Sequence, residues 1–370
     1  MNKRVFVFLL AVILLASSAQ AQVFKTPISS QHPIDAPTEQ DIVEVIGKLL
    51  SKDLASRINI SGYFQGGYMA NEEENRFEFR RAVLIADAQI TDKWRMTVIP
   101  ELRSSQVLEA YVEYKVSPAL QVRFGQYKNP FSIENQLSPT VMEFVNLCAL
   151  STDYFSAQGP IDALVGGHSG RDQGLMLHGN LLQAKRGYHA LQYNLALMNG
   201  QGMNVRDGNN HKDIIATLGY KPCKEALISA SIWEGRGHAI DNSAYVPTVA
   251  IGDNYRRARW SVGGELRTSL FDFRSEYMAG RDANVRSKGY YTTGTLHVTN
   301  DIDLSLSYDY VNRNKAMGDA AKQTNYAVGA SYWFYPRCRL QLAYTHTNTH
   351  DDVLNPAAGN LLQAGFQVRF

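Results

Sequence analysis

The sequence lacks a long apolar run beyond its first residues, and its 370 residues include only three cysteines, Cys148, Cys223 and Cys338. A membrane-spanning helix needs roughly 20 consecutive apolar residues, so none is predicted after residue 21. Secreted domains that depend on disulfides usually carry more cysteines, in even number. The sequence therefore excludes a bundle of transmembrane helices and a disulfide scaffold.

Net charge of either sign is also nearly absent, because 37 Lys and Arg face 35 Asp and Glu. The cleavage proposed below removes two basic residues and leaves 35 of each, so no general attraction to nucleic acid is expected. We expect no enzyme activity, cofactor or metal. His346 and His350 would lie about 13 Å apart along a strand, too far to share an ion.

The N-terminus has the features of a secretory signal peptide. Lys3 and Arg4 precede the apolar segment 5–16, and Ala19-Gln20-Ala21 is a typical cleavage site. We predict a signal peptide at residues 1–21, a linker with a short amphipathic helix at 22–57, and a β-barrel at 58–370 that includes an in-folded loop, 129–170.

From residue 58 onward, apolar and polar residues alternate with period two, which is typical of strands that have one apolar face. In the last segment, Phe366, Val368 and Phe370 alternate with polar residues, and we expect these three to form the membrane-insertion signal. An even number of strands is expected for a bacterial barrel. The predicted segments are 58–69, 76–90, 94–103, 107–115, 119–128, 171–179, 187–198, 212–221, 225–234, 255–266, 269–279, 287–298, 302–312, 324–335, 337–347 and 360–370.

The joins between these segments differ in length in a regular way. Those after the even-numbered segments are short, whereas most of the others are longer, including 129–170, 235–254 and 280–286. Short turns at one rim and long loops at the other are typical of outer-membrane barrels. The predicted fold is all-β: a transmembrane, antiparallel, up-and-down barrel of about 16 strands, with a short N-terminal helix.

Selectivity in a pore comes from charged side chains at a narrow place. Alternation predicts that nine arginines face the lumen, where they either line the pore or form ion pairs with acidic neighbours. The loop 129–170 contains acidic residues and no Lys or Arg, so it would set negative charge opposite a positive wall. The basic candidates are Arg95, Arg103, Arg123, Arg257, Arg259, Arg267, Arg274, Arg337 and Arg339, and the acidic ones are Glu134, Glu143, Asp153 and Asp162.

Several segments resemble the phosphate-selective porin O and P family, including its Bacteroidetes-type members. The resemblance is strongest in residues 108–114, LEAYVEY, and in residues 122–134, VRFGQYKNPFSIE, and it continues in residues 170–177, GRDQGLML. It implies a sixteen-stranded barrel, usually a trimer, with the third long loop folded into the lumen. The family's phosphate-binding side chains have no matched positions in this sequence.

These observations predict a porin in the outer membrane of a Gram-negative bacterium, with a water-filled diffusion channel for small hydrophilic solutes. A preference for anions or phosphate is left open. The alternatives are a structural or adhesin barrel with a closed lumen and a substrate-specific oligosaccharide channel. The expected partners are outer-membrane lipid and lipopolysaccharide, the barrel-assembly machinery, two further copies in a homotrimer, and small solutes or anions in the lumen.

Overall fold

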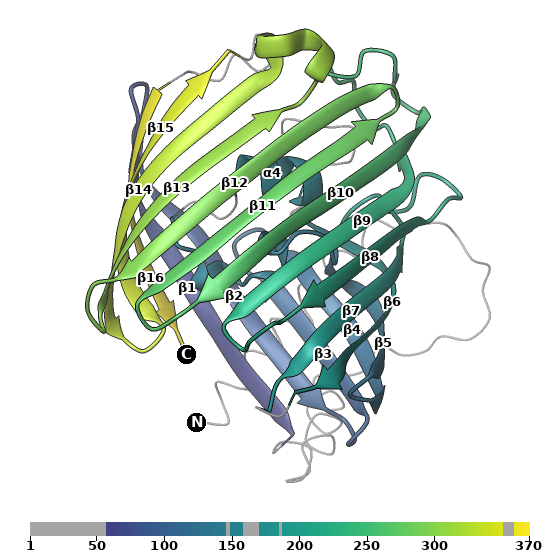
Figure 1. The fold of residues 1–370 in the computed structure, drawn as a ribbon, viewed down its shortest axis with the longest axis horizontal. Helices are drawn as coiled ribbons and strands as arrows, with labels where there is room; N and C mark the ends of the chain where they lie inside the picture. The colour runs from purple at the N-terminus through teal and green to yellow at the C-terminus, as the bar shows by residue number, and fades with distance from the viewer. Residues whose placement is uncertain (1–56, 146–148, 158–169, 185–186, 351–358) are drawn as a thin grey trace, which may run out of the picture.

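The computed structural model describes residues 57–145, 149–157, 170–184, 187–350 and 359–370. The predicted signal peptide, the linker and nearly all of the segment assigned to the short helix lie outside these residues. Sixteen antiparallel strands form one closed barrel, in which each strand pairs with its neighbours in sequence and β1 pairs with β16 (Figure 1). The all-β barrel predicted from the alternation is therefore confirmed, including its strand number.

The strands follow the predicted segments closely, with shifts at their ends. They are β1 (Ile58–Ala70), β2 (Asn75–Gln89), β3 (Trp94–Glu101), β4 (Gln106–Ser117), β5 (Leu120–Lys128), β6 (Arg171–Gln183), β7 (His189–Met198), β8 (Asp213–Tyr220), β9 (Ala226–His238), β10 (Asn254–Arg267), β11 (Phe271–Asp282), β12 (Val285–His297), β13 (Ile302–Asn312), β14 (Lys322–Tyr335), β15 (Cys338–Thr349) and β16 (Gly359–Arg369).

Short helical turns occur only in the connections of the described residues. The third long connection contains η1 (Glu134–Gln136), η2 (Pro139–Val141), α4 (Leu150–Thr152) and η3 (Asp153–Ala157), and η5 (Lys315–Ala321) joins β13 to β14. No helix in the described part of the chain is both long and apolar enough to cross a bilayer.

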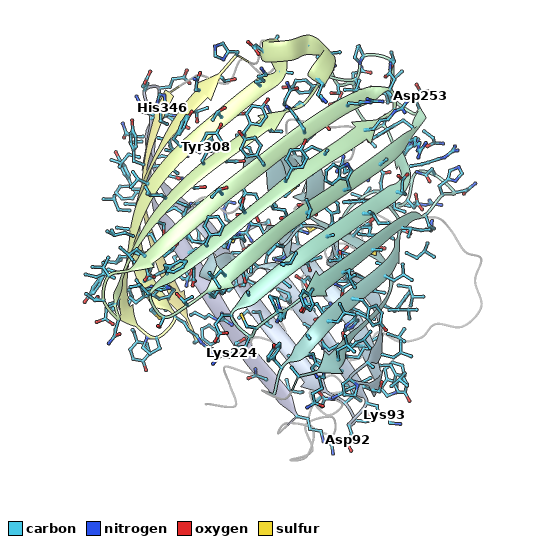
Figure 2. The ribbon with its side chains drawn as sticks, in the orientation of Figure 1. Asp92, Lys93, Lys224, Asp253, Tyr308 and His346 are labelled. Carbon is cyan, nitrogen blue, oxygen red and sulfur yellow. The ribbon has the colours of Figure 1, made fainter. Side chains whose placement is uncertain are left out.

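The two rims differ as the loop lengths predicted, with one exception. Asp92, Lys93 and Lys224 mark the short-turn rim and Asp253 the opposite one (Figure 2). The predicted long join 280–286 is wrong, because β11 continues to Asp282 and β12 begins at Val285. The pairing of β11 with β12 continues beyond the apolar part of the outer surface. There polar side chains interrupt the apolar–polar alternation on which the prediction depended.

Large apolar side chains cover the outside of the barrel, and polar ones face inward. On β9, Ile228 and Ile232 are about half exposed on the outer face, whereas Trp233 is buried inside. At the C-terminus, Phe366 and Val368 of β16 and the following Phe370 are likewise exposed on the outer face. This distribution is that of a barrel surrounded by lipid, with a polar interior.

Candidate functional site

The described parts of the connection 129–170, residues 129–145 and 149–157, fold into the barrel, where α4 lies behind β11 to β13 (Figure 1). It contacts strands far along the chain. The Thr140 carbonyl accepts a hydrogen bond from Gln367 Nε2 on β16 at 3.2 Å. Ser151 Oγ donates to Asp309 Oδ1 on β13 at 3.0 Å. The loop is thus held against the wall made by the C-terminal half of the barrel.

Two of the arginines predicted to face the lumen bind the backbone of this loop. Arg259 Nη1 on β10 donates to the carbonyl of Phe155 at 2.6 Å. Arg339 Nη2 on β15 donates to the carbonyl of Met142 at 2.7 Å. Both arginines are only 2% exposed. Their guanidinium groups satisfy loop carbonyls that would otherwise be buried without a partner.

A buried ion cluster fixes the loop at a third point. Arg274 on β11 donates through Nη1 and Nη2 to both carboxylate oxygens of Glu143, at 2.9 and 2.8 Å. Its Nη2 also lies 3.2 Å from Glu134 Oε1. Burial would raise the pKa of Glu143, but the Arg274 guanidinium outweighs this effect and holds the pKa below its ordinary value. We call Arg274, Glu134 and Glu143 the loop clamp.

The loop clamp brings the acidic residues of the loop into contact with the basic wall. Glu134 and Glu143 do face a positive wall, but they touch it, and their side chains are only 4% and 14% exposed. Charges in direct contact cancel most of each other's potential at a distance. Asp153 is the first residue of η3 and is partly buried, and Asp162 lies outside the described residues.

The loop also covers a large part of the predicted basic lining. The expectation that Arg257, Arg259, Arg274 and Arg339 line a water-filled pore is corrected, because each is at most 3% exposed. These four side chains fix connections inside the barrel. The sequence pattern identified their inward direction but contained no signal for the connections that cover them.

Arg257 belongs to a second buried cluster, at the start of the connection 199–212. Asp213 Oδ2 accepts hydrogen bonds from Trp233 Nε1 at 2.7 Å and from Arg257 Nη1 at 3.3 Å. Arg257 Nη2 donates to the Gly200 carbonyl at 3.1 Å. Gly200 has a φ of +81°, and a Cβ there would lie 2.6 Å from the Asp213 carboxyl carbon. This position therefore requires glycine.

Three other predicted arginines face the interior and are ion-paired. The shortest nitrogen–oxygen distances are 2.6 Å for Arg95 with Asp87, 2.7 Å for Arg123 with Glu113, and 2.8 Å for Arg267 with Glu265. For these three, the structure supports the alternative in which the lumenal arginines pair with acids, although their side chains keep partial exposure.

The last two predicted arginines do not lie on strands. Arg103 belongs to the tight turn 102–105 between β3 and β4. Arg337 occupies the turn before β15 with a φ of +67° and is exposed. Their predicted strand positions are therefore wrong, because each segment was extended by a residue or two into a turn.

The wall formed by β2 to β6 carries a basic group that the sequence analysis missed. Arg80 and Arg81 are adjacent on β2, where the pairing with β1 skips one residue: Gln65 pairs with Arg81 and Gly66 with Phe79. Such a bulge interrupts the alternation of faces. The exposed Phe79 marks the outer face beside it, so both arginines lie toward the interior.

The charged neighbours of Arg80 are Glu78, whose carboxylate lies 3.9 Å away, and Arg81 and Arg103. We call the three arginines the guanidinium cluster. Among the described residues, no carboxylate lies within ion-pair distance of Arg81 or Arg103, and Arg80 Nη1 has no hydrogen-bond partner. Glu101 is 6% exposed and accepts a backbone hydrogen bond from Ala82. The cluster therefore presents positive charge to the lumen.

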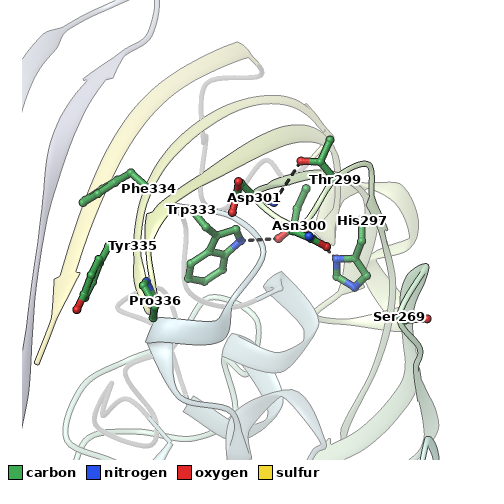
Figure 3. Close-up of a pocket in the computed structure, with 10 residues that line it drawn as sticks. Ser269, His297, Thr299, Asn300, Asp301, Trp333, Phe334, Tyr335 and Pro336 are labelled. Carbon is green, nitrogen blue, oxygen red and sulfur yellow. Dashed lines mark hydrogen bonds and ion pairs between the residues drawn. The ribbon is translucent and has the colours of Figure 1, made fainter.

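At the short-turn rim, a cavity of about 650 Å³ opens between the turns that follow β10, β12 and β14 (Figure 3). His297 and Trp333 both bind Asp303: His297 Nδ1 lies 2.7 Å from Oδ1, and Trp333 Nε1 donates to Oδ2 at 2.7 Å. The cavity gives this end of the barrel a polar and aromatic mouth.

Comparison with known proteins relates part of the chain to a family. The model of the phosphate-selective porin O and P family matches residues 54–226, which run from before β1 to the start of β9. Over these residues, the chain is similar to this family. A sequence comparison with curated proteins finds no match.

Solved structures show that the porin shares its fold with other outer-membrane barrels. An anion-selective porin from Comamonas acidovorans has a TM-score of 0.61 at 11% identity, over 85% of this chain and 99% of the other. OmpT of Vibrio cholerae, in its trimer form, has a TM-score of 0.61 at 14% identity, over 85% of this chain and 99% of the other. The channel DcaP of Acinetobacter baumannii gives 0.58 at 12% identity, over 85% and 97%. The family match and the shared fold together support an outer-membrane diffusion channel.

Asp153 should make the packing of the porin's third loop depend on pH. Burial raises the pKa of its carboxyl to about 6 from 3.8, and the Arg313 guanidinium offsets part of this rise. The packed loop then binds the proton more tightly than the released loop, so its stability falls as the pH rises from 3.8 to about 6. We expect a loss of about 1–3 kcal/mol.

Hydrogen exchange of amides 150–157 tests this, with the wild type compared at each pH to Asp153→Asn. The variant cannot ionise at this position, so at pH 7.5 its amides 150–157 should exchange more slowly than those of the wild type. At pH 4 the two proteins should exchange at the same rate. An advantage of equal size at both pH values would show that the carboxyl does not titrate in the packed loop.

Proposed function

We propose that solutes cross the porin between its third loop and the wall of β2 to β6, and that small anions pass in preference to cations. The main support for the anion preference is the guanidinium cluster, because Arg81 and Arg103 have no ion-paired carboxylate among the described residues. The acidic residues of the loop clamp are buried and neutralised, so they oppose this potential only weakly.

The arrangement of aromatic side chains favours this pore over an oligosaccharide channel. Sugar-conducting channels would need aromatic rings exposed along the lumen. Here Tyr127, Trp233 and Tyr291 face the interior but are at most 2% exposed, because residues of the third loop pack against them. The partly exposed inner wall carries mostly charged and polar groups, which suit small hydrated solutes.

Reconstitution in a planar bilayer tests the proposal. The purified porin should give stable conductance steps, and a KCl gradient should give a reversal potential of the sign that chloride permeation produces. A membrane that stays closed would contradict the open pore and favour the structural or adhesin barrel. A reversal potential of the opposite sign would contradict the anion preference alone.

We further propose that the mature porin begins at Gln22 and acts without enzymatic chemistry as a homotrimer, inserted by the barrel-assembly machinery through Phe366, Val368 and Phe370. Support comes from the small residues Ala19 and Ala21 before the cleavage site and from the outward, apolar end of β16. The trimer form of OmpT, which shares the fold, supports the oligomeric state. Mass measurement of the mature chain and of the native assembly tests these proposals.

A further inference from the structure

The outer face of β10 to β13 changes from aromatic to basic toward the long-loop rim. Tyr277, Tyr290 and Tyr310 lie side by side, since Tyr290 pairs with both of the others across the sheet. Figure 2 shows the nearby Tyr308 on the same outer surface. Rows of tyrosine and tryptophan mark the boundary between the hydrocarbon of a membrane and its headgroups.

Basic side chains lie directly above this row. Lys288 is the next outward residue on β12 and pairs with Ala279, and one step further Arg281 pairs with Arg286. Arg256 on β10 and Lys315 in η5 lie as close to the long-loop rim as Arg281 and Arg286, or closer. We call Arg256, Arg281, Arg286, Lys288 and Lys315 the basic shelf.

The basic shelf has little compensating acid. Arg256 lies 3.2 Å from Glu234, and Arg281 Nε donates to the carbonyl of Ala283 at 2.8 Å. For Arg281, Arg286, Lys288 and Lys315, the described residues supply no carboxylate within ion-pair distance. Like charges directly opposite each other destabilise a sheet, so the pair formed by Arg281 and Arg286 needs an anion to offset its repulsion.

Beside the shelf, the outer surface is hollowed by a cavity of about 480 Å³. Ala258 and Ala279 form its floor, Trp260 and Tyr277 bound it on the membrane side, and Arg281 bounds it on the rim side. The two rings are a tilted pair with centroids 5.4 Å apart. The hollow thus has an apolar, aromatic end within the lipid and a cationic end at the height of the headgroups.

We propose that this surface binds a phosphorylated glycolipid of the outer leaflet. The arginines and Lys288 hold its phosphate groups, while its sugar and the start of its acyl chains lie over Ala258, Ala279 and Trp260. Guanidinium groups bind phosphate oxygens in pairs of hydrogen bonds, which suits the facing Arg281 and Arg286. The proposal rests on the outer-membrane location of the porin but not on the selectivity of its pore.

The test uses the full-length porin in detergent, with diphosphorylated lipid A and dephosphorylated lipid A as probes in native mass spectrometry. The triple variant Arg281→Gln, Arg286→Gln and Lys288→Gln should bind diphosphorylated lipid A at least about tenfold more weakly. Binding of the dephosphorylated lipid should change little. A matched variant at the opposite rim, Lys93→Gln, Lys221→Gln and Lys224→Gln, should keep wild-type affinity.

Each contrary result overturns the proposal. Equal losses in the two triple variants would mean unspecific attraction, and unchanged binding in the shelf variant would place the lipid elsewhere. Competition by free pyrophosphate at the same concentration as lipid A would assign the shelf to a soluble anion. The shelf variant should retain wild-type conductance, and this readout shows that it is folded and separates failure of this proposal from failure of the pore.

Discussion

Replacing Arg274 with methionine should release the third loop from the barrel wall and change the conductance of the porin more than any other single substitution. The variant leaves Glu134 and Glu143 buried without their cation, at 4% and 14% exposure. Removing one partner of a buried ion cluster costs about 3–5 kcal/mol, because the remaining charges stay dehydrated. The loop can avoid this cost by leaving the wall.

Single-channel recording and limited proteolysis measure the release. The conductance of Arg274→Met should fluctuate between levels, and cleavage within residues 129–145 should become faster. Arg95→Met is the matched control, since Arg95 is also an inward-facing, ion-paired arginine but lies on β3, where its partner is Asp87. It should behave like the wild type.

A compensated variant tests the physical cause. In Arg274→Met with Glu134→Gln and Glu143→Gln, no buried charge is left unpaired, so much of the loop packing should return. If Arg274→Met alone conducts steadily and resists cleavage like the wild type, the clamp does not hold the loop.

The strands were predictable because each has a lipid-facing side, and the apolar residues of that side recur at every second position. The pattern failed where the lipid ends. Residues 279–282 and 285–288 continue the ladder of β11 and β12 above the membrane, and there the outward positions carry Arg281, Arg286 and Lys288. A run of polar residues in a barrel can therefore be either a loop or the upper end of a strand.

The lumen was less predictable than the barrel, because its arrangement depends on contacts between residues far apart in the chain. Alternation placed Arg259 and Arg274 inside, but their partners Phe155 and Glu143 lie more than one hundred residues earlier. At Arg80 and Arg81, strict alternation would send one arginine to the lipid, whereas the bulge opposite Gln65 keeps both inside. A bulge leaves no mark in the pattern of a single sequence.

Neutralising the guanidinium cluster should shift the selectivity of the pore toward cations. In the variant Arg81→Gln with Arg103→Gln, two lumenal charges without an ion-paired carboxylate are removed. A charge within a Debye length of the solute path contributes about 0.5–1 kcal/mol in a wet pore, so each loss should lower the chloride-to-potassium permeability ratio about two- to fivefold. The ratio follows from the reversal potential in a KCl gradient. The shift should shrink as the salt concentration rises, because salt screens exposed charges.

The control removes the same charge from the other side of the wall. Arg281→Gln with Arg286→Gln changes two outward arginines of the basic shelf and should leave the reversal potential at its wild-type value. Equal shifts in both double variants would mean that the overall charge of the porin sets its selectivity, and no shift in either would place the solute path away from β2. Arg80 is kept in both variants because its guanidinium is ion-paired with Glu78, 3.9 Å away. A shift confined to Arg81→Gln with Arg103→Gln would therefore locate the selective part of the pore at the wall opposite the third loop.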